Sequence, residues 1–365
     1  MDKEKVKFTT LVLAGSLLTT FSNIGSGWAA SLISLAGFVI FLIGLNSMKE
    51  IMDEQGKSAV SLIFIGVIIG AVGALIGLIP LLGAVIAGLC FIAAFIIQLI
   101  GYIRLKSSTV IGEIGAKGAN LLVISMIVVL VGSVFSIIPA VGGFIAPLFY
   151  LAALLLIFNG WFKIQQGLIG ETSGKVVAVS MVLSGMLIQL SNNAASGWGA
   201  AVASIIGLIL LFMGLNRLKT MLDEPGQSAV KLIIIAIFIG VAASLLDFVS
   251  SIVNASSGLQ GFAMGDLSGF MSGPTTFDMI VAIVFIVAFA VELMGLMKLK
   301  ASSMLDASGK SGTTLLVVAM ILAALASLFT GILPFGAGVL NSLLGLAGMF
   351  LVLYGWLRIQ MSFAE

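Results

Sequence analysis

A polar segment of the chain occurs twice, and the apolar sequence on either side of each copy is long enough to cross a membrane. Residues 44–60 read GLNSMKEIMDEQGKSAV, and residues 214–230 read GLNRLKTMLDEPGQSAV. Asparagine, glycine and most acidic and basic positions agree in register, which indicates an internal duplication. Each copy is therefore expected to be a short polar connection between two membrane helices.

The composition of the chain excludes a water-soluble fold. Hydrophobic residues make up 60% of the 365 residues and charged residues only 9%, so polar side chains are too few to cover a surface in contact with water. The apolar runs are continuous rather than alternating, which favours helices over the strands of a membrane barrel. The sequence therefore predicts an all-α polytopic membrane protein in contact with the lipid bilayer.

Polar clusters divide the chain into twelve predicted transmembrane helices. Most have the roughly 20 residues that cross a hydrocarbon core of about 30 Å. The N-terminal segment has the composition of a signal peptide, but Asn23 and the Ser-Gly-Trp sequence at 26–28 recur at Asn193 and 196–198, so we expect a retained helix. The predicted spans are 8–22, 29–49, 59–79, 84–104, 118–138, 143–163, 175–191, 197–217, 229–248, 278–298, 313–333 and 339–359.

The spans group into six two-helix units, three in each half. Even-numbered spans end in similar basic sequences, as at 45–49 and 215–219, and the loops between units contain acid-x-x-Gly-Lys sequences such as 53–57. All seventeen Lys and Arg residues lie at the N-terminus, in these loops or at the adjoining helix ends. The positive-inside rule makes this side, with both termini, cytoplasmic. The sequence therefore predicts two parallel six-helix repeats, 1–170 and 171–365, in a prokaryotic cytoplasmic membrane.

The two halves differ by an insertion in the second. We expect the extra length at 250–276, as a Gly- and Ser-rich loop on the extracytoplasmic side whose charged neighbours Asp247, Asp266 and Asp278 are all acidic. Such a loop is either a lid or partner-binding segment, or an insertion that the surface tolerates.

The third span carries a row of small residues that predicts close helix packing. Gly66, Gly70, Gly73 and Gly77 recur at three- to four-residue spacing and share one helical face. The corresponding positions of the second half are occupied by Ala236, Gly240, Ala243 and Asp247. Asp247 therefore places a carboxylate where the first half has a glycine, and it is either a functional group or an interfacial one.

Glu292 is the acidic residue that lies most clearly inside a predicted span. It precedes Lys298 by six residues, and Gln98 occupies its position in the first half. An ionised carboxylate in a bilayer costs about 2.5–3.5 kcal/mol on insertion scales, so such residues usually face a cavity or a partner. We interpret Glu292 and Gln98 as candidates for a substrate or proton path, with an interhelical hydrogen bond as the alternative.

The remaining chemistry-bearing residues favour structural roles. Trp28 and Trp198 are expected to anchor helices at the membrane interface, with Asn23 and Asn193 as helix caps. Cys90 lies in an apolar run, and the chain contains no histidine, which excludes histidine-based metal sites and triads. We therefore expect no enzymatic activity, no metal, no cofactor and no nucleic-acid partner.

The predicted layout of two parallel six-span halves resembles that of the major-facilitator transporters. The acid-x-x-Gly-basic loops after the second and eighth spans are similar to the cytoplasmic motif of that family. The glycine of that motif lies four residues before the acid, whereas Gly44 lies nine before Asp53, and no long linker joins the halves. We therefore assign no family from the sequence.

Two functional interpretations remain. In the first, the protein transports a small solute, an ion or a lipid along a path between the repeats, lined by Gln98 and Glu292. In the second, it is a non-catalytic membrane scaffold or assembly subunit that binds a protein partner, or another copy of itself, through glycine-rich faces or the 250–276 loop. The shape of the interior around Glu292 distinguishes the two.

Overall fold

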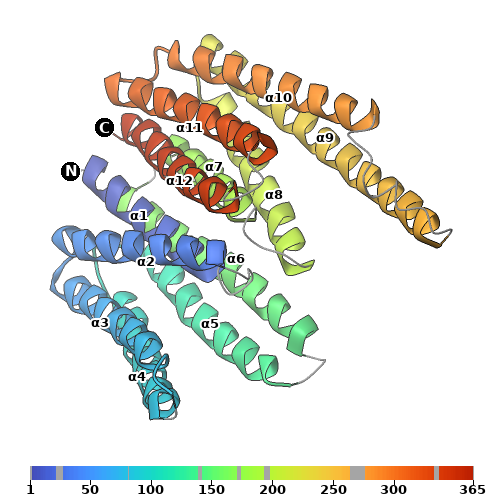
Figure 1. Ribbon diagram of the computed structural model, residues 1–365. Coiled ribbons are helices and arrows are strands. Elements are labelled where there is room, and N and C mark those ends of the chain that lie inside the picture. The colour runs from blue at the N-terminus through green and yellow to red at the C-terminus, as the bar shows by residue number, and fades with distance from the viewer. Residues whose placement is uncertain are drawn as a thin grey trace.

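The computed structural model describes residues 2–21, 28–80, 82–138, 142–170, 174–192, 198–263, 276–332 and 337–364. Side chains are described within these ranges except at residues 2, 21, 28–30, 82, 192, 250–263, 276–278, 328–332 and 337–342. The described chain forms twelve α-helices and one 3-10 turn, without strands (Figure 1). The helices are α1 (Asp2–Phe21), α2 (Trp28–Met48), α3 (Glu54–Ile76), α4 (Leu82–Leu105), α5 (Gly112–Ser136), α6 (Gly142–Ile169), α7 (Gly174–Asn192), α8 (Trp198–Thr220), α9 (Glu224–Ala263), α10 (Thr276–Lys300), α11 (Ala307–Ile332) and α12 (Ala337–Ser362).

Eleven of these helices are long and apolar enough to cross a membrane. The protein is therefore an all-α polytopic membrane protein, as its composition predicts. The helix outside this set is α1, because Lys3, Glu4, Lys5 and Lys7 crowd its first two turns. Its remaining residues are almost entirely buried, so α1 contacts other helices rather than lipid over most of its length.

Consecutive helices pack as antiparallel hairpins. Each odd-numbered helix makes its most extensive contacts with the helix that follows it, which gives the pairs α1–α2, α3–α4, α5–α6, α7–α8, α9–α10 and α11–α12. The pairs follow the predicted two-helix units. Superposition of residues 1–170 on 171–365 stays a prediction.

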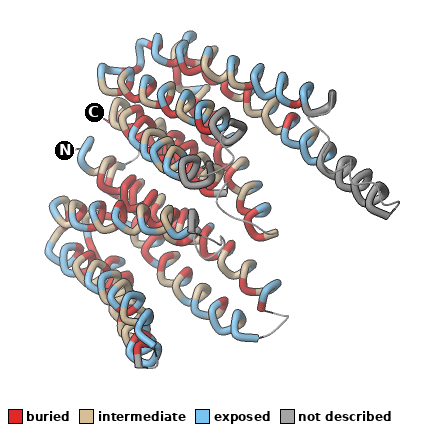
Figure 2. Tube along the Cα trace, in the orientation of Figure 1, coloured by how far each residue is buried: buried red, intermediate tan, exposed pale blue. Residues whose placement is uncertain are grey.

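The centre of the molecule is formed by α1, α6, α7 and α12. Helix α1 contacts α6, α7 and α12, and α7 also contacts α12. The apolar segment of α7 is 72% buried, a larger share than in any other candidate span, and buried residues cluster along α1 and α7 (Figure 2). The two halves of the chain are therefore joined through the first and last helix of each half.

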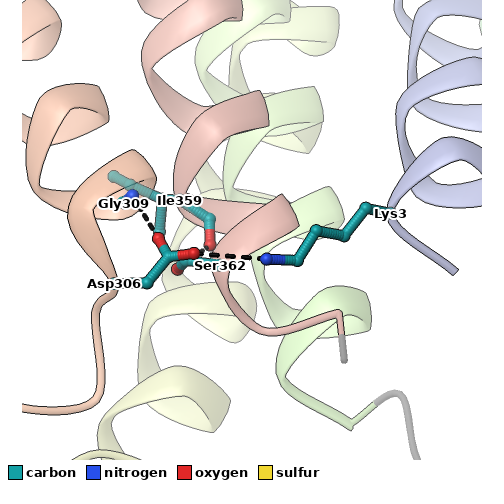
Figure 3. Close-up of polar contacts among 5 residues, drawn as sticks. All are labelled: Lys3, Asp306, Gly309, Ile359 and Ser362. Atoms are coloured by element: carbon teal, nitrogen blue, oxygen red, sulfur yellow. Dashed lines mark hydrogen bonds and ion pairs between the residues drawn. The ribbon is translucent and has the colours of Figure 1, made fainter.

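The two chain ends lie close together in Figure 1, and specific contacts hold them there. Val6, Val176 and Ala364 form a small buried apolar cluster. Lys3 Nζ lies 3.3 Å from Asp306 Oδ2, and the amide of Gly309 donates to Asp306 Oδ1 at 2.8 Å (Figure 3). Because Lys3 and Asp306 are 49% and 41% exposed, their ion pair stabilises the fold by at most about 1 kcal/mol. We refer to this end of the bundle as the termini side.

Asp53 joins the start of the second hairpin, α3–α4, to the loop that follows α4. It precedes α3, and its Oδ1 atom accepts hydrogen bonds from the amide of Gly56 and the hydroxyl of Ser108, both at 2.7 Å. Its Oδ2 atom accepts from the amide and the hydroxyl of Thr109, both at 2.8 Å. Burial alone would raise the pKa of the Asp53 carboxyl, but these hydrogen bonds outweigh it and hold the pKa well below its usual range. One carboxylate thus caps a helix and fixes the loop that leaves the same hairpin.

Asp223 makes the same contacts in the fifth hairpin. Oδ1 accepts from the amide of Gly226 at 3.2 Å and from the hydroxyl of Ser302 at 2.5 Å. Oδ2 accepts from the amide and hydroxyl of Ser303, both at 2.7 Å. Burial opposes ionisation, yet the hydrogen bonds dominate and lower the pKa of Asp223 to about 2. In both copies of the duplicated polar segment, an aspartate therefore binds the start of one helix to the loop that follows the hairpin.

Replacing Asp223 by asparagine should destabilise the protein in a pH-dependent way. At neutral pH we expect a loss of about 1 kcal/mol, because asparagine can still cap the helix but its amide nitrogen cannot accept the hydrogen bonds that Ser303 donates to Oδ2. Because the folded-state pKa lies below that of the unfolded chain, the stabilisation is complete above about pH 4 and is lost as the pH falls through about 2. The gap in unfolding temperature between wild type and Asp223→Asn should therefore close between pH 4 and pH 2. A constant gap over this range would contradict the account, and Asp247→Asn, at an exposed position of α9, is the control.

The glycines of α3 do not all pack closely. A Cβ atom at Gly66 would lie 2.6 Å from Gln98 Cγ, and one at Gly73 would lie 2.7 Å from Cys90 Cβ, so α3 and α4 approach closely at these two points. Gly77 is also close to α4, with Ala87 Cβ at 3.3 Å. At Gly70 the first neighbour is at 3.6 Å, and at Gly240 there is none within 4 Å. The close-packing prediction therefore does not extend to Gly70 or Gly240, although they share the predicted face.

Part of the predicted extracytoplasmic loop is helical. Helix α9 continues to Ala263, so residues 250–263 extend the helix instead of forming the start of a loop. The segment contains no proline, and its two glycines at 258 and 261 are too few to end a helix that is already formed. Residues 264–275 lie outside the described chain, and the lid interpretation stays a prediction.

Candidate functional site

A cavity lined mainly by helices of the second half includes Glu292 in its wall. Its volume is about 510 Å³, and its walls come from α2 and from α7 to α12. Most of the lining consists of Leu, Ile, Val, Ala, Gly and Met side chains; the polar members are Glu292, Gln189 and Ser327. We call this space the α7–α12 cavity. Its volume lies in the range of small-molecule sites, about 300–1,000 Å³.

Two of these polar side chains have hydrogen-bond partners within the protein. Gln189 Nε2 donates to the carbonyl of Ser204 at 2.6 Å, and Ser204 Oγ donates back to Gln189 Oε1 at 2.7 Å. These bonds tie α7 to α8. Ser327 Oγ donates to the carbonyl of Ala323, one turn earlier in α11, at 3.1 Å. None of these hydrogen bonds involves Glu292.

Glu292 is a half-buried carboxyl on α10, and no described side chain makes a hydrogen bond or ion pair with it. Lys298, two turns further along the same helix, bonds instead to Ser228 Oγ of α9 at 3.3 Å. The interhelical hydrogen bond considered as an alternative role for Glu292 is thus absent from the described residues. The α7–α12 cavity therefore presents one carboxyl group, with open hydrogen-bonding capacity, to an apolar space.

Gln98 lies in a different cavity. A space of about 330 Å³ in the first half is lined by helices that include α1, α3, α4, α5 and α6. Its polar lining comprises Gln98 and the hydroxyl side chains of Ser16, Thr19, Thr20, Ser125 and Tyr102. We call it the α1–α6 cavity. Gln98 and Glu292 therefore line two different cavities in the described structure, and a single path lined by both stays a prediction.

A ring of buried hydrogen bonds joins the two halves of the chain. Thr10 Oγ1 donates to Gln360 Oε1 at 2.6 Å, Gln360 Nε2 donates to Ser180 Oγ, Ser180 Oγ donates to Gln165 Oε1 at 2.6 Å, and Gln165 Nε2 donates to Thr10 Oγ1 at 2.9 Å. These four residues, which we call the polar ring, come from α1, α6, α7 and α12 and are at most 1% exposed.

The polar ring satisfies its own members. The second N–H of each amide is also used, since Gln165 Nε2 donates to Thr9 Oγ1 and Gln360 Nε2 to the carbonyl of Val176, both at 3.1 Å. A network in which every buried polar group has a partner stabilises a unique arrangement. The ring itself therefore presents no free polar group to a solute.

Sequence reasoning missed the polar ring, although the duplication contains its signal. Thr10 and Ser180 are 170 positions apart, the same offset as the duplicated segment. The two glutamines follow the matching basic sequences at 161–163 and 356–358 by two residues. A hydroxyl and an amide retained at corresponding buried positions of both halves indicate a shared hydrogen-bonding role.

The other predicted site residues lie apart from both cavities. Asp247 is exposed just past the middle of α9 and is not among the described lining residues of either space. Trp198 packs on Phe144 of α6, with ring centroids 5.1 Å apart. The side chain of Trp28, and Asn23 and Asn193 altogether, fall outside the described residues. Among the residues searched, no group of acidic or cysteine side chains is arranged to hold a metal ion.

Comparison with known proteins leaves the site to be interpreted from its own geometry. No protein-family model, curated protein or solved structure gives a significant match to the chain.

Proposed function

We propose that the protein is a membrane transporter of small hydrophobic solutes and that the α7–α12 cavity is its substrate site. The observation that carries the proposal is the Glu292 carboxyl, which lies in a membrane-spanning helix, faces a cavity of about 510 Å³ and has no described partner. Acidic groups inside a membrane usually mark substrate or proton pathways. An apolar cavity with one such group has the character of a small-molecule site.

A comparison of the two halves supports a role for charge. At the position that corresponds to Glu292, the first half has Gln98, which also faces a cavity but is neutral. A glutamine can fill a purely structural position there without the cost of a carboxylate in the bilayer, about 2.5–3.5 kcal/mol on insertion scales. The second half carries that cost without a hydrogen bond to offset it in the described structure. A function that needs a negative charge or a titratable proton accounts for the difference.

In this proposal solutes enter and leave through one half rather than along the contact between the halves. The polar ring closes that contact near the termini side, whereas the α7–α12 cavity is bounded by helices that also face lipid, such as α9 and α10, whose spans are only 17% and 22% buried. A hydrophobic solute reaches such a cavity from the bilayer and needs no aqueous path. The scarcity of polar lining, a weakness for transport of polar solutes, fits this class of substrate.

The test is solute movement in reconstituted vesicles. Purified protein in liposomes should accelerate the uptake of at least one member of a panel of cationic, neutral and anionic hydrophobic fluorophores, relative to protein-free liposomes of the same lipid. No acceleration for any member, together with a stable protein partner that co-purifies with the chain, would favour the scaffold interpretation instead.

We further propose that the termini side is cytoplasmic, on the basis of the one-sided distribution of Lys and Arg. In a Cys90→Ala background, a cysteine at Ser58, near the start of α3, should be protected from a membrane-impermeant thiol reagent added to intact cells. A cysteine at Ser257, near the far end of α9, should react. Both should react in permeabilised cells, and the reverse pattern in intact cells would invert the orientation.

A further inference from the structure

The charge of the α7–α12 cavity limits what it can bind. Glu292 is the only ionisable residue among the described lining, and the other polar members, Gln189 and Ser327, already donate to groups within the protein. The cavity therefore combines a single negative charge with apolar walls. A ligand that complements it has one positive charge and a hydrophobic body.

We propose that the α7–α12 cavity binds a lipophilic organic monocation, with the cationic group beside Glu292. This inference rests on the proposed transport function and names its substrate class. The body of the ligand packs against aliphatic side chains and against Met186, Met320 and Met349, which line the same space. Methionine is flexible and polarisable, so these walls adapt to ligands of different shape and make favourable contacts with aromatic groups.

Other ligand classes fit the cavity less well. An anion would meet the Glu292 carboxylate at close range in a medium of low dielectric constant, where repulsion between like charges is strong. Ca²⁺ and Mg²⁺ need about six or more oxygen ligands, and Glu292 is the only carboxyl group in the described lining. A dication would retain one uncompensated charge in an apolar space. With a monocation, the charge of the ligand and the charge of the Glu292 carboxylate are both paired.

The α1–α6 cavity provides a control within the same chain. Its Gln98 aligns in sequence with Glu292, but its polar lining, Gln98 with several hydroxyl groups, carries no charge in the described residues. The proposal therefore predicts one cation site per chain, and it attributes the difference between the halves to the exchange of a glutamine for a glutamate.

Binding of radiolabelled tetraphenylphosphonium tests the inference directly. The full chain in nanodiscs of zwitterionic lipid should bind this cation saturably at one site, above the level of empty nanodiscs. Radiolabelled tetraphenylborate, an anion of nearly the same size and shape, should show no saturable binding. Glu292→Gln should weaken tetraphenylphosphonium binding at least tenfold, whereas Gln98→Leu should leave it unchanged.

A second variant guards against an effect of Glu292→Gln on folding. Ala323→Trp fills the cavity from α11, where the side chain of Ala323 faces open space, and it should also abolish binding while leaving Glu292 in place. Retention of full affinity in both variants, equal binding of the anion, or no saturable binding of the cation would overturn the proposal.

The outcomes also separate the ligand class from the transport function. Binding of the cation without movement of any solute across vesicles would support the site and contradict transport. Movement of neutral solutes alone, without cation binding, would support transport and contradict the ligand class.

Discussion

Replacing Gly15 by alanine should lower the unfolding temperature of the protein strongly, whereas the same change at Gly240 should not. A Cβ atom at Gly15 would lie 2.6 Å from Phe41 Cα and 2.8 Å from the carbonyl oxygen of Gly37, both in the backbone of α2. Backbone atoms cannot rotate away as a flexible side chain does, so α1 and α2 must separate. We expect a cost of about 1–3 kcal/mol or more from this overpacking.

Gly240 supplies the matched control for this experiment. No atom lies within 4 Å of a Cβ placed there, and alanine favours a helix over glycine by about 0.8–1 kcal/mol. Gly240→Ala should therefore be neutral or stabilising. Gly185→Ala should resemble Gly15→Ala, because its Cβ would meet the carbonyl of Gly207 and the amide of Leu211 in α8. Equal thermal unfolding of Gly15→Ala and Gly240→Ala in the same detergent would show that α1 and α2 are not packed as closely as the structure has them.

The contrast among the glycines of α3 illustrates the limit of prediction from sequence. Three- to four-residue spacing correctly places Gly66, Gly70, Gly73 and Gly77 on one face, because that follows from helix geometry alone. Which of them approaches the neighbouring helix depends on how α3 and α4 lie against each other. Gly66 and Gly73 meet residues of α4, whereas Gly70 borders the α1–α6 cavity. The spacing contains no information about that second helix.

The membrane helices were predictable for a similar physical reason. Long apolar runs and polar breaks are local properties of the chain. Because lipid offers the backbone no hydrogen-bond partners, such runs form helices, which satisfy their backbone groups internally. The central position of α1 was not predictable in this way. It has the least apolar sequence of the twelve helices, with four threonines and three lysines. The hydroxyl groups of Thr9 and Thr10 are tolerated because they bond to Gln165 and Gln360 on other helices.

The sequence predicts which residues belong to the candidate site but not where in the fold the site lies. Composition identifies Glu292 as an acid inside a span, and the duplication identifies Gln98 as its counterpart. The prediction that both line one path assumed that the functional space lies between the halves. In the structure the polar ring joins the halves, and Gln98 and Glu292 line two separate cavities. Long-range packing of α1, α6, α7 and α12 decides this arrangement, and no local pattern records it.

Loss of transport in the Glu292→Gln variant is the second large effect that we expect. The substitution keeps the shape of the side chain and introduces the group that the first half already has at Gln98, so the fold should be retained and the unfolding temperature should stay close to that of wild type. If the charge or proton of Glu292 is needed at the substrate site, solute uptake should fall to the level of protein-free vesicles. Stability and activity would then separate, which a purely structural role of Glu292 does not predict.

The most direct measurement compares uptake of one transported fluorophore into vesicles that contain equal amounts of folded wild type, Glu292→Gln or Gln98→Leu protein. Gln98→Leu changes the other cavity and leaves the α7–α12 cavity untouched. The account predicts uptake with wild type and Gln98→Leu and none above background with Glu292→Gln. Undiminished uptake with Glu292→Gln, or loss of uptake with Gln98→Leu alone, would contradict the assignment of the substrate site to the α7–α12 cavity.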